Sequence, residues 1–174
     1  CAHFHKKPFT MAVATATTSA ISVAGNNGNM IVPQLEFVFA AEARLAPPLL
    51  IGSTYEGQRR IIPILEGSFA GPDIRGTFVS AGAADWQYTR GDGVTQAEAT
   101  YAIQTDDGVL IQIQNFGLRH GSAEVMQRLA AGTPVDPGEY YFRTNPRFKA
   151  PDGKYDWLNK SIFVASGARF ADSI

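Results

Sequence analysis

The 174 residues carry 15 basic and 16 acidic side chains, which gives a formal net charge of −1 at pH 7. A chain of this length is expected to form one domain, and its 45% hydrophobic content is ordinary for a globular protein. Because there is no basic excess and no apolar run of the roughly 18 residues that a membrane helix needs, we expect neither nucleic-acid nor membrane partners.

Cysteine and histidine are scarce. Cys1 is the only cysteine, and the histidines are His3, His5 and His120. These residues provide neither an internal disulfide nor the ligand spacing of a zinc site, and the glycine-rich motifs that cradle phosphates are missing. We therefore predict no metal and no cofactor. A lone cysteine permits a reducing compartment, so the expected location is cytoplasmic.

Residues 1–30 are rich in Ala, Thr, Ser, Gly and Asn and are predicted to form a flexible N-terminal arm. Within this arm, residues 11–23 contain Val, Ile and Thr, so they could also pair as an edge strand. The folded domain is predicted to span residues 31–174.

Alternating apolar and polar residues predict a series of strands. The first begins near Ile31, where Leu35, Phe37 and Phe39 occupy every second position. Asp92-Gly93 and Asp106-Asp107-Gly108 are typical hairpin turns and join three of the later strands. The remaining extended runs cover residues 49–51, 57–66, 74–80, 86–90, 94–105, 109–118, 139–147 and 157–165.

One helix is predicted over residues 122–131. Ser122 is a suitable N-cap, an apolar stripe follows, and Gly132 and Pro134 end the helix. Eight or so strands with one short helix indicate an all-β fold, which we take to be a single antiparallel β-barrel. The interior of such a barrel can be filled by side chains or can hold one small ligand.

Several short strings occur in order along the chain, at residues 59–64 (RRIIPI), 67–72 (GSFAGP), 84–87 (ADWQ), 105–108 (TDDG), 119–121 (RHG), 140–148 (YYFRTNPRF) and 157–159 (WLN). Together they resemble the DUF3237 family, also called UPF0311, over residues 33–168. The resemblance implies a barrel similar in kind to calycin and allene-oxide-cyclase barrels, some of which act as cyclases or isomerases. Glu66 stands where the family pattern has Gly, and Thr100 where a basic residue is common. The final strand expected after Asp172 is missing, a gap that the N-terminal arm could fill.

Trp86 is the strongest candidate for a ligand wall, since its ring with one N–H suits a half-wet cavity; the alternative is a Trp of the barrel core. Asp85, Glu98 and Glu66 are candidate acid–base carboxylates, because burial inside a barrel would raise a carboxyl pKa. Glu98 faces water instead if the more apolar set on its strand points inward.

Arg143 is a candidate partner for a carboxylate of the protein or of a ligand. Its alternative role is a structural salt bridge. Tyr88, Tyr101 and Tyr141 are candidate phenol donors or ligand walls, with core packing as the default. His120 and Asn159 could contact a ligand or could stabilise local turns.

The leading functional hypothesis is a cofactor-free isomerase or cyclase acting on a small apolar metabolite that carries a carbonyl group. The alternatives are a lipocalin-like barrel that only binds such a molecule and a structural or oligomer-forming module. An assembly of two identical chains is compatible with the sequence.

Overall fold

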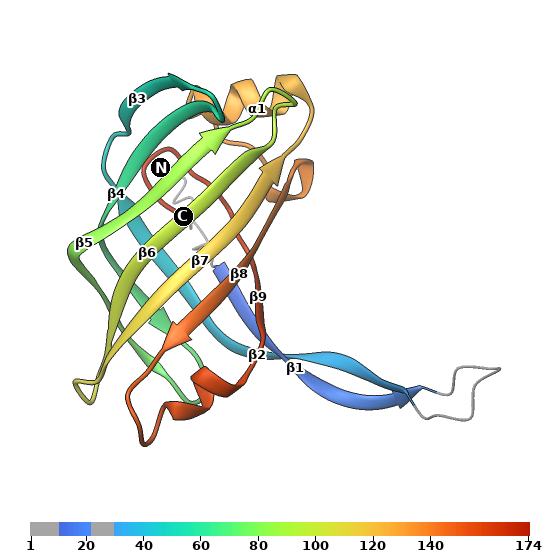
Figure 1. Ribbon diagram of the computed structural model, residues 1–174, viewed down its shortest axis with the longest axis vertical. Coiled ribbons are helices and arrows are strands. Elements are labelled where there is room, and N and C mark those ends of the chain that lie inside the picture. The colour runs from blue at the N-terminus through green and yellow to red at the C-terminus, as the bar shows by residue number, and fades with distance from the viewer. Residues whose placement is uncertain (1–10, 22–29) are drawn as a thin grey trace, which may run out of the picture.

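The computed structural model describes residues 11–21 and 30–174, which form a closed antiparallel β-barrel (Figure 1). The sheet order is β2-β1-β9-β8-β7-β6-β5-β4-β3, and β2 also pairs with β4, so eight strands close on themselves and β3 lies beside β4. The predicted all-β barrel is confirmed. The strands are β1 (Met11–Ile21), β2 (Met30–Leu45), β3 (Leu49–Thr54), β4 (Gly57–Ala70), β5 (Arg75–Thr89), β6 (Thr95–Thr105), β7 (Leu110–His120), β8 (Tyr141–Lys149) and β9 (Phe163–Ser166).

Strand β1 closes the barrel. It pairs with β2 along its length and with β9 from Ala12 to Thr15. Part of the predicted arm therefore supplies a barrel strand and fills the gap between β9 and β2. Figure 1 shows the far part of β1 and its partner β2 extending away from the barrel as a two-stranded ribbon. The rest of the predicted arm, at residues 1–10 and 22–29, lies outside the described residues.

Three of the predicted strands differ from those observed. Residues 74–80 and 86–90 belong to one strand, β5, whose register shifts between Val79 and Ala84. The single strand predicted over residues 157–165 is wrong: η2, a 3-10 helix over Asp156–Lys160, precedes the short β9. The turn forms because the Asn159 side chain bonds both the N–H and the carbonyl of Ala150, and because Leu158 is buried below the barrel.

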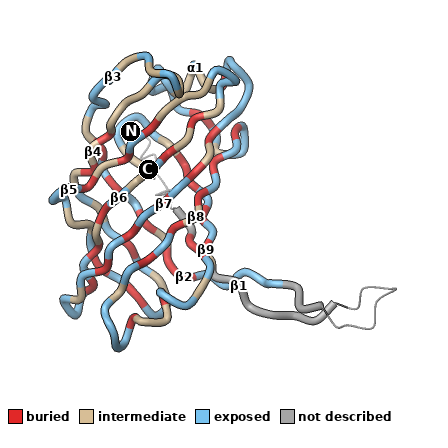
Figure 2. The backbone as a smooth tube through the Cα atoms, in the orientation of Figure 1, coloured by how far each residue is buried: buried red, intermediate tan, exposed pale blue. Residues whose placement is uncertain are grey.

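The interior near η2 is packed with aromatic rings. Phe39 contacts Phe69 and Phe148 at ring-centroid distances of 5.3 and 6.1 Å, and Phe148 contacts Phe163 at 4.7 Å. Figure 2 shows buried and exposed positions alternating along the strands, as expected when one face of each strand points inward. We call this part, which η2 closes, the ring-packed end of the interior.

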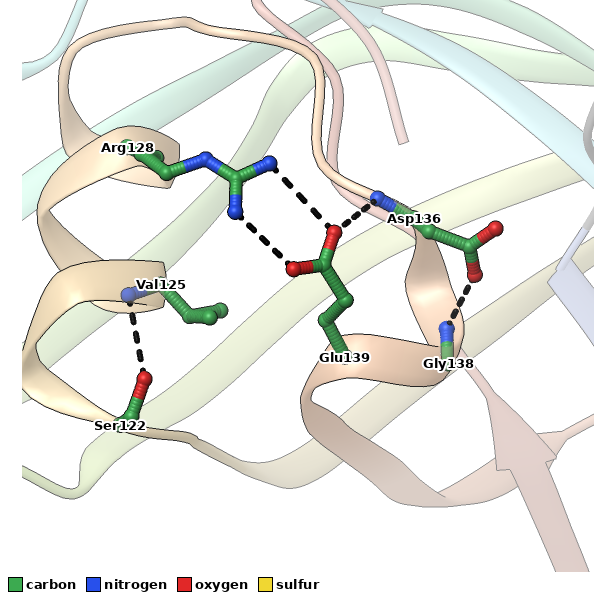
Figure 3. A network of polar contacts seen from close by, with 6 residues as sticks. All are labelled: Ser122, Val125, Arg128, Asp136, Gly138 and Glu139. Atoms are coloured by element: carbon green, nitrogen blue, oxygen red, sulfur yellow. Dashed lines mark hydrogen bonds and ion pairs between the residues drawn. The ribbon is translucent and has the colours of Figure 1, made fainter.

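Helix α1 (Ala123–Ala130) lies beside the opposite end and confirms the predicted helix (Figure 1). Ser122 caps it by accepting a hydrogen bond from the N–H of Val125 at 3.3 Å. Figure 3 shows Arg128 reaching Glu139, at 2.9 Å, in the following 3-10 helix η1 (Pro137–Glu139), where Asp136 and Glu139 form a capping box. These contacts hold α1 and η1 together.

Residues 167–174, which sequence patterns left undetermined, fold back onto β2. The backbones of Ala43 and Ile174 exchange two hydrogen bonds of 2.9 and 3.0 Å, and the N–H of Leu45 donates to Asp172 at 2.7 Å. The Ile174 side chain packs against the barrel core and against the cluster under α1. No helix of the described residues is long and apolar enough to cross a membrane.

Candidate functional site

The interior near α1 carries polar side chains in place of rings. Asp85 and Gln87 of β5 are 8% and 2% exposed, and Arg119 of β7 is 4% exposed. Asn115 and Thr144 are also buried, while Arg60 and Arg169 are partly buried beside them. We call this set the inner polar cluster: Arg60, Asp85, Gln87, Asn115, Arg119, Thr144 and Arg169.

A chain of hydrogen bonds fixes one side of the cluster. Arg60 donates from Nε and Nη2 to the Gln87 Oε1 at 3.1 and 2.8 Å. Gln87 in turn donates from Nε2 to Asp85 Oδ2, and the backbone N–H of Glu98 donates to Asp85 Oδ1 at 3.0 Å. Both oxygens of the Asp85 carboxylate therefore accept hydrogen bonds. The Gln87 amide bridges the Arg60 guanidinium and this carboxylate.

Burial shifts the protonation of both Asp85 and Arg119. Desolvation raises the pKa of Asp85 above its ordinary 3.8, although Gln87, Arg119 and the Glu98 N–H oppose the shift. Burial, together with the neighbouring Arg60, lowers the pKa of Arg119 to about 10. Asp85 thus exchanges its proton closer to neutral pH than an exposed carboxyl does, while Arg119 stays charged at neutral pH.

A small cavity of about 50 Å³ opens beside the cluster. It exists because β2 and β6 contribute small inward side chains at Ala41, Ala43 and Ala99. Its volume is far below the roughly 300–1,000 Å³ of most small-molecule sites, and it has room for a few waters or one small polar group. The other lining residues are Leu45, Ile64, Phe78, Asp85, Gln87, Tyr101, Asn115, Arg169 and Ile174.

Two of the sequence-predicted site residues, Asp85 and Tyr101, line this cavity. The Tyr101 ring stacks on Phe78 at 5.2 Å between centroids. Burial raises the pKa of Tyr101 above its ordinary value, against the opposing effect of the Asn115 side chain. The phenol therefore stays protonated at neutral pH and can donate a hydrogen bond.

Trp86, Tyr88 and Glu98 lie on the outer face of the barrel. Trp86 and Tyr88 alternate with the inward Asp85 and Gln87, and Trp86 is 41% exposed. Glu98 lies directly opposite Trp86 on β6 and points the same way. The expectation that Trp86 lines the lumen or belongs to the barrel core is wrong, because its strand position turns it outward; for Glu98, the water-facing alternative is the one observed. With Phe116 and two arginines, Trp86 and Glu98 line an outer groove of about 480 Å³.

Tyr141, Arg143 and His120 also face outward. The His120 and Tyr141 rings stack at 4.9 Å, and the Arg143 guanidinium lies 5.4 Å from the Tyr141 ring centre. Arg143 donates to the Phe142 carbonyl at 2.9 Å. Arg143 therefore does not join Asp85 inside the barrel, and any role of these three residues in ligand binding would belong to the outer surface.

Glu66 and Asn159 lie away from the inner polar cluster. Glu66 is exposed and pairs with Arg44 at 2.7 Å on the outer surface. Asn159 is occupied by Ala150 in the turn near η2. Among the described residues, no group of three His, Cys, Asp or Glu side chains is placed to hold a metal ion.

Comparison with known proteins places this barrel in a family. The family model described as "Protein of unknown function (DUF3237)" matches residues 33–174. The chain belongs to the DUF3237 family. It is 42% identical over 146 residues to a "UPF0311 protein" of Rhodopseudomonas palustris, which covers 83% of this chain and 95% of the relative.

Solved structures of similar chains share the fold. The crystal structure of a conserved protein of unknown function from Rhodopseudomonas palustris has a TM-score of 0.77 at 42% identity and covers 82% of this chain and 94% of that one. A "beta-barrel like protein" from Acinetobacter baumannii has a TM-score of 0.66 at 38% identity, covering 82% and 92%.

A fungal protein with a named activity is also similar. The "Hydroalkoxylation enzyme phnH" of Penicillium herquei is 32% identical to this DUF3237 chain over 106 residues, which are 60% of this chain and 67% of the fungal protein.

Most of the inner polar cluster was missed by the sequence patterns of this DUF3237 member. The alternation along β7 could have revealed it, because Asn115 and Arg119 are separated from the buried Ile111 and Ile113 by even numbers of residues and so lie on the same face of the strand. Gln87 likewise lies two residues from Asp85 on β5 and therefore on the same face. Arg60 likewise alternates in step with the buried Ile62 and Ile64 on β4, whereas Arg169 lies outside any strand and gave no such signal.

Proposed function

We propose that this DUF3237 barrel is an isomerase or cyclase that binds a small carbonyl-bearing metabolite beside the inner polar cluster and works by proton transfer. The observation that supports this most is Asp85, a buried carboxylate at the wall of the interior cavity. Its raised pKa brings it nearer the range in which a carboxyl group can both accept and return a proton.

One reaction of this class is ring closure by addition of a hydroxyl group to a carbon–carbon double bond conjugated with a carbonyl. The Asp85 carboxylate would take the hydroxyl proton as the oxygen bonds to the alkene carbon. The displaced electron pair would move onto the carbonyl oxygen as an enolate, and Asp85 would return the proton to the adjacent carbon. All atoms remain in the product, so no oxidant or reductant is needed.

The name of the Penicillium relative supports this choice, since hydroalkoxylation is the addition of an O–H group across a double bond. Tyr101 supports it as well. Its neutral phenol lines the same cavity as Asp85 and would donate to the carbonyl oxygen, where negative charge develops.

Substrate entry would require the cavity to enlarge. At about 50 Å³ it admits no metabolite of several carbon atoms. Arg169 and Ile174 line it, and the segment that carries them is held to β2 by three backbone hydrogen bonds. Each such bond contributes about 1 kcal/mol net, so displacing the segment would cost a few kcal/mol that ligand contacts can offset.

A second candidate function is non-catalytic binding of the same class of ligand. It is favoured by the hydrogen bonds of Asp85, both of whose oxygens already have partners within the protein. A carboxylate engaged in this way can be a purely structural element of the barrel.

Asp85→Asn separates the two functions, and Glu98→Gln is the matched control because the Glu98 side chain faces outward. We would incubate the protein with a panel of hydroxy-enones and detect mass-neutral products by chromatography. We expect wild type and Glu98→Gln to convert the same compound, and Asp85→Asn to lose about a hundredfold or more in kcat. Full activity of Asp85→Asn would contradict the enzyme mechanism, and binding by wild type without conversion would favour the carrier.

A further inference from the structure

Three buried residues with unpartnered polar atoms surround one glycine on the inner wall. Asn115 and Arg119 are inward positions of β7 on either side of Gly117. Thr144 of β8 lies directly opposite Gly117, and its Cγ2 would be 2.6 Å from a Cβ at that glycine. The atoms without a hydrogen-bond partner are Asn115 Oδ1, Arg119 Nε and Nη1, and Thr144 Oγ1. We call Asn115, Arg119 and Thr144 the unpartnered patch.

Small residues separate this patch from Asp85. On β6, Ala97 lies opposite Gly117 and Ala99 lies opposite Asn115. On the next strand, Asp85 lies opposite Ala99. Neighbouring strands are about 4.8 Å apart, so Asp85 and Asn115 face each other across roughly 10 Å of wall floored by methyl groups. That floor has polar groups at both sides, and Tyr101, two residues along β6 from Ala99, interacts with both Asp85 and Asn115.

The patch carries positive charge without a hydrogen-bonded anionic partner, although Arg119 and Asp85 attract each other electrostatically. The inner polar cluster holds three arginines and one carboxylate, and that carboxylate is bonded to Gln87 and to the backbone of Glu98. Arg60 is satisfied by Gln87, and Arg169 donates to the carbonyls of Phe170 and Ser173. The Arg119 guanidinium lies over the ring of Phe142, 5.4 Å from its centroid, and its Nε and Nη1 atoms have no hydrogen-bond partner.

Such an arrangement is costly unless something else binds there. Buried polar atoms are nearly always hydrogen-bonded, and a buried guanidinium cannot shed its charge at neutral pH. Residues that break this rule are found where a ligand supplies the missing partner. The missing partner of Arg119 and of the Thr144 hydroxyl is a hydrogen-bond acceptor, and the charge of Arg119 favours a negative one.

We infer that the unpartnered patch is a subsite for an oxyanion, and that the ligand of this barrel carries a carboxylate or an equally acidic enol group. This inference rests on the proposed function in one respect: it assumes that the metabolite enters this part of the interior. Arg119 and Thr144 donate to the anionic oxygens. Asn115 Oδ1 is an acceptor and does not contact the anion, while the Asn115 side chain interacts with the Tyr101 phenol.

The subsite also orients the ligand. With its anionic group at Arg119, the ligand extends over Ala97 and Ala99 toward Asp85. A hydroxyl group several bonds from the acidic group would then lie beside the carboxylate that exchanges the proton. The substrate class is therefore an acidic hydroxy-enone, as distinct from a neutral one.

The test compares carboxylates with neutral amides of the same shape on the full chain. Formate and acetate are titrated beside formamide and acetamide, with sodium chloride to match ionic strength, and binding is followed by calorimetry and by the thermal unfolding midpoint. We expect both carboxylates to bind and to raise the midpoint, and each amide to bind about tenfold or more weakly. Equal affinity for carboxylate and amide would overturn the inference.

Arg119→Met and Arg147→Met are the matched variants, since Arg147 is an exposed arginine on the outer face of β8. We expect Arg119→Met to lose the preference for carboxylates and, without ligand, to unfold at a higher temperature than wild type because an unpaired buried charge is gone. If carboxylate binding is lost in Arg147→Met and kept in Arg119→Met, the anion belongs to the outer groove and the inference is wrong.

Should Arg119→Met fail to fold, Thr144→Val keeps the test open, because it removes only the hydroxyl while preserving the shape. We expect it to weaken carboxylate binding severalfold; unchanged binding would contradict the subsite. The titration involves no turnover, so its failure leaves the Asp85 mechanism standing for neutral substrates. Conversely, carboxylate binding at Arg119 together with full activity of Asp85→Asn would remove the mechanism and leave the subsite.

Discussion

The two ends of the barrel interior are built from the same eight strands and the same alternation of side chains, yet they differ in kind. Near η2 the inward positions carry Phe69, Phe148 and Phe163, whose rings are in mutual contact or share a neighbour. Near α1 they carry Asp85, Gln87 and Arg119, which are buried to a similar degree as the rings. The alternation therefore decides only which positions are buried, and the residue type decides what each end does.

The two ends therefore differ in what they contribute: the η2 end to stability, and the α1 end to the proposed function. Rings at the η2 end bury apolar surface and contribute favourably to folding. Polar atoms without partners at the α1 end cost free energy in the absence of a ligand. Strained or unsatisfied groups of this sort persist at functional sites when the remaining structure supports them. The ring-packed end is what allows the other end to stay polar.

The largest effect is expected at the ring-packed end, from Phe163→Ala. The Phe163 side chain is 1% exposed, and its ring lies 4.7 Å from Phe148 and 6.1 Å from Trp157. Removing it leaves a cavity among rings that can relax only partly. We expect the free energy of unfolding to fall by about 3–5 kcal/mol in urea titrations.

Val164→Ala is the matched control for that measurement. Val164 follows Phe163 in β9 but faces outward and is 40% exposed, so its truncation is expected to cost about 1 kcal/mol or less. Equal losses in the two variants would show that the η2 end is not the stabilising part of the interior.

A smaller effect, with a distinctive pH dependence, is expected at the polar end from Asp85→Asn. Burial raises the pKa of Asp85, so the folded state binds this proton more tightly than the unfolded state does. Its contribution to stability is therefore fully present below the ordinary value near 3.8 and is lost as pH rises through the raised pKa. One proton sets an upper limit of about 1.4 kcal/mol per pH unit on the slope. We expect this loss in wild type and not in Asp85→Asn.

Asp107 provides a comparison of opposite sign. Hydrogen bonds from Lys154 and Thr105 hold the pKa of this exposed carboxyl below its ordinary value. The contribution of Asp107 to folding stability is therefore present above the ordinary carboxyl pKa of 3.8 and is lost as the pH falls below it. Asp107→Asn should reduce the acid sensitivity of unfolding. Unfolding midpoints between pH 3 and pH 8 measure both variants. Parallel pH profiles for Asp85→Asn and wild type would contradict the buried state of Asp85.

The fold was predictable where local chemistry decides it. Asp-Gly turns need positive φ, and Gly93 and Gly108 have φ values of 83° and 85°. Helix α1 was predictable from its Ser122 cap. The pairing of β1 with β9 was not predictable, because it joins segments about 150 residues apart. It depends on barrel closure, and the periodicity of a sequence reports only local structure. The turn at η2 depends on the contact between Asn159 and Ala150, which is likewise tertiary.

The site was harder to predict because polar residues were assumed to face water. On β6 the rule worked: the more apolar Ala97, Ala99, Tyr101 and Ile103 point inward, and Glu98 points outward. On β7 it failed. Alternation put Asn115 and Arg119 inside with Ile111, but the predicted strand ended at residue 118 and neither residue was proposed for the site. Where a barrel encloses charged groups, the alternation of residues along a strand therefore predicts the inward positions better than residue polarity does.

The smallest effect is expected on the outer surface, from Glu66→Gln. This residue was a candidate catalytic acid because a carboxylate at the end of an apolar strand would be costly if buried. In the structure it is exposed and pairs with Arg44 at 2.7 Å, also exposed. Such surface pairs contribute between about 0 and 1 kcal/mol and are screened by salt. We expect Glu66→Gln to change the free energy of unfolding by no more than that, and to leave hydroxy-enone conversion intact.

Arg44→Gln completes this last measurement as a double-mutant cycle. If the ion pair is the whole contribution of Glu66, the double variant should be no less stable than either single variant, and 0.5 M sodium chloride should abolish the difference from wild type. A loss of activity in Glu66→Gln at unchanged stability would contradict this view. It would move the chemistry out of the interior to the outer surface at β2 and β4, and the polar end of the barrel would then need another explanation for its unpartnered arginine.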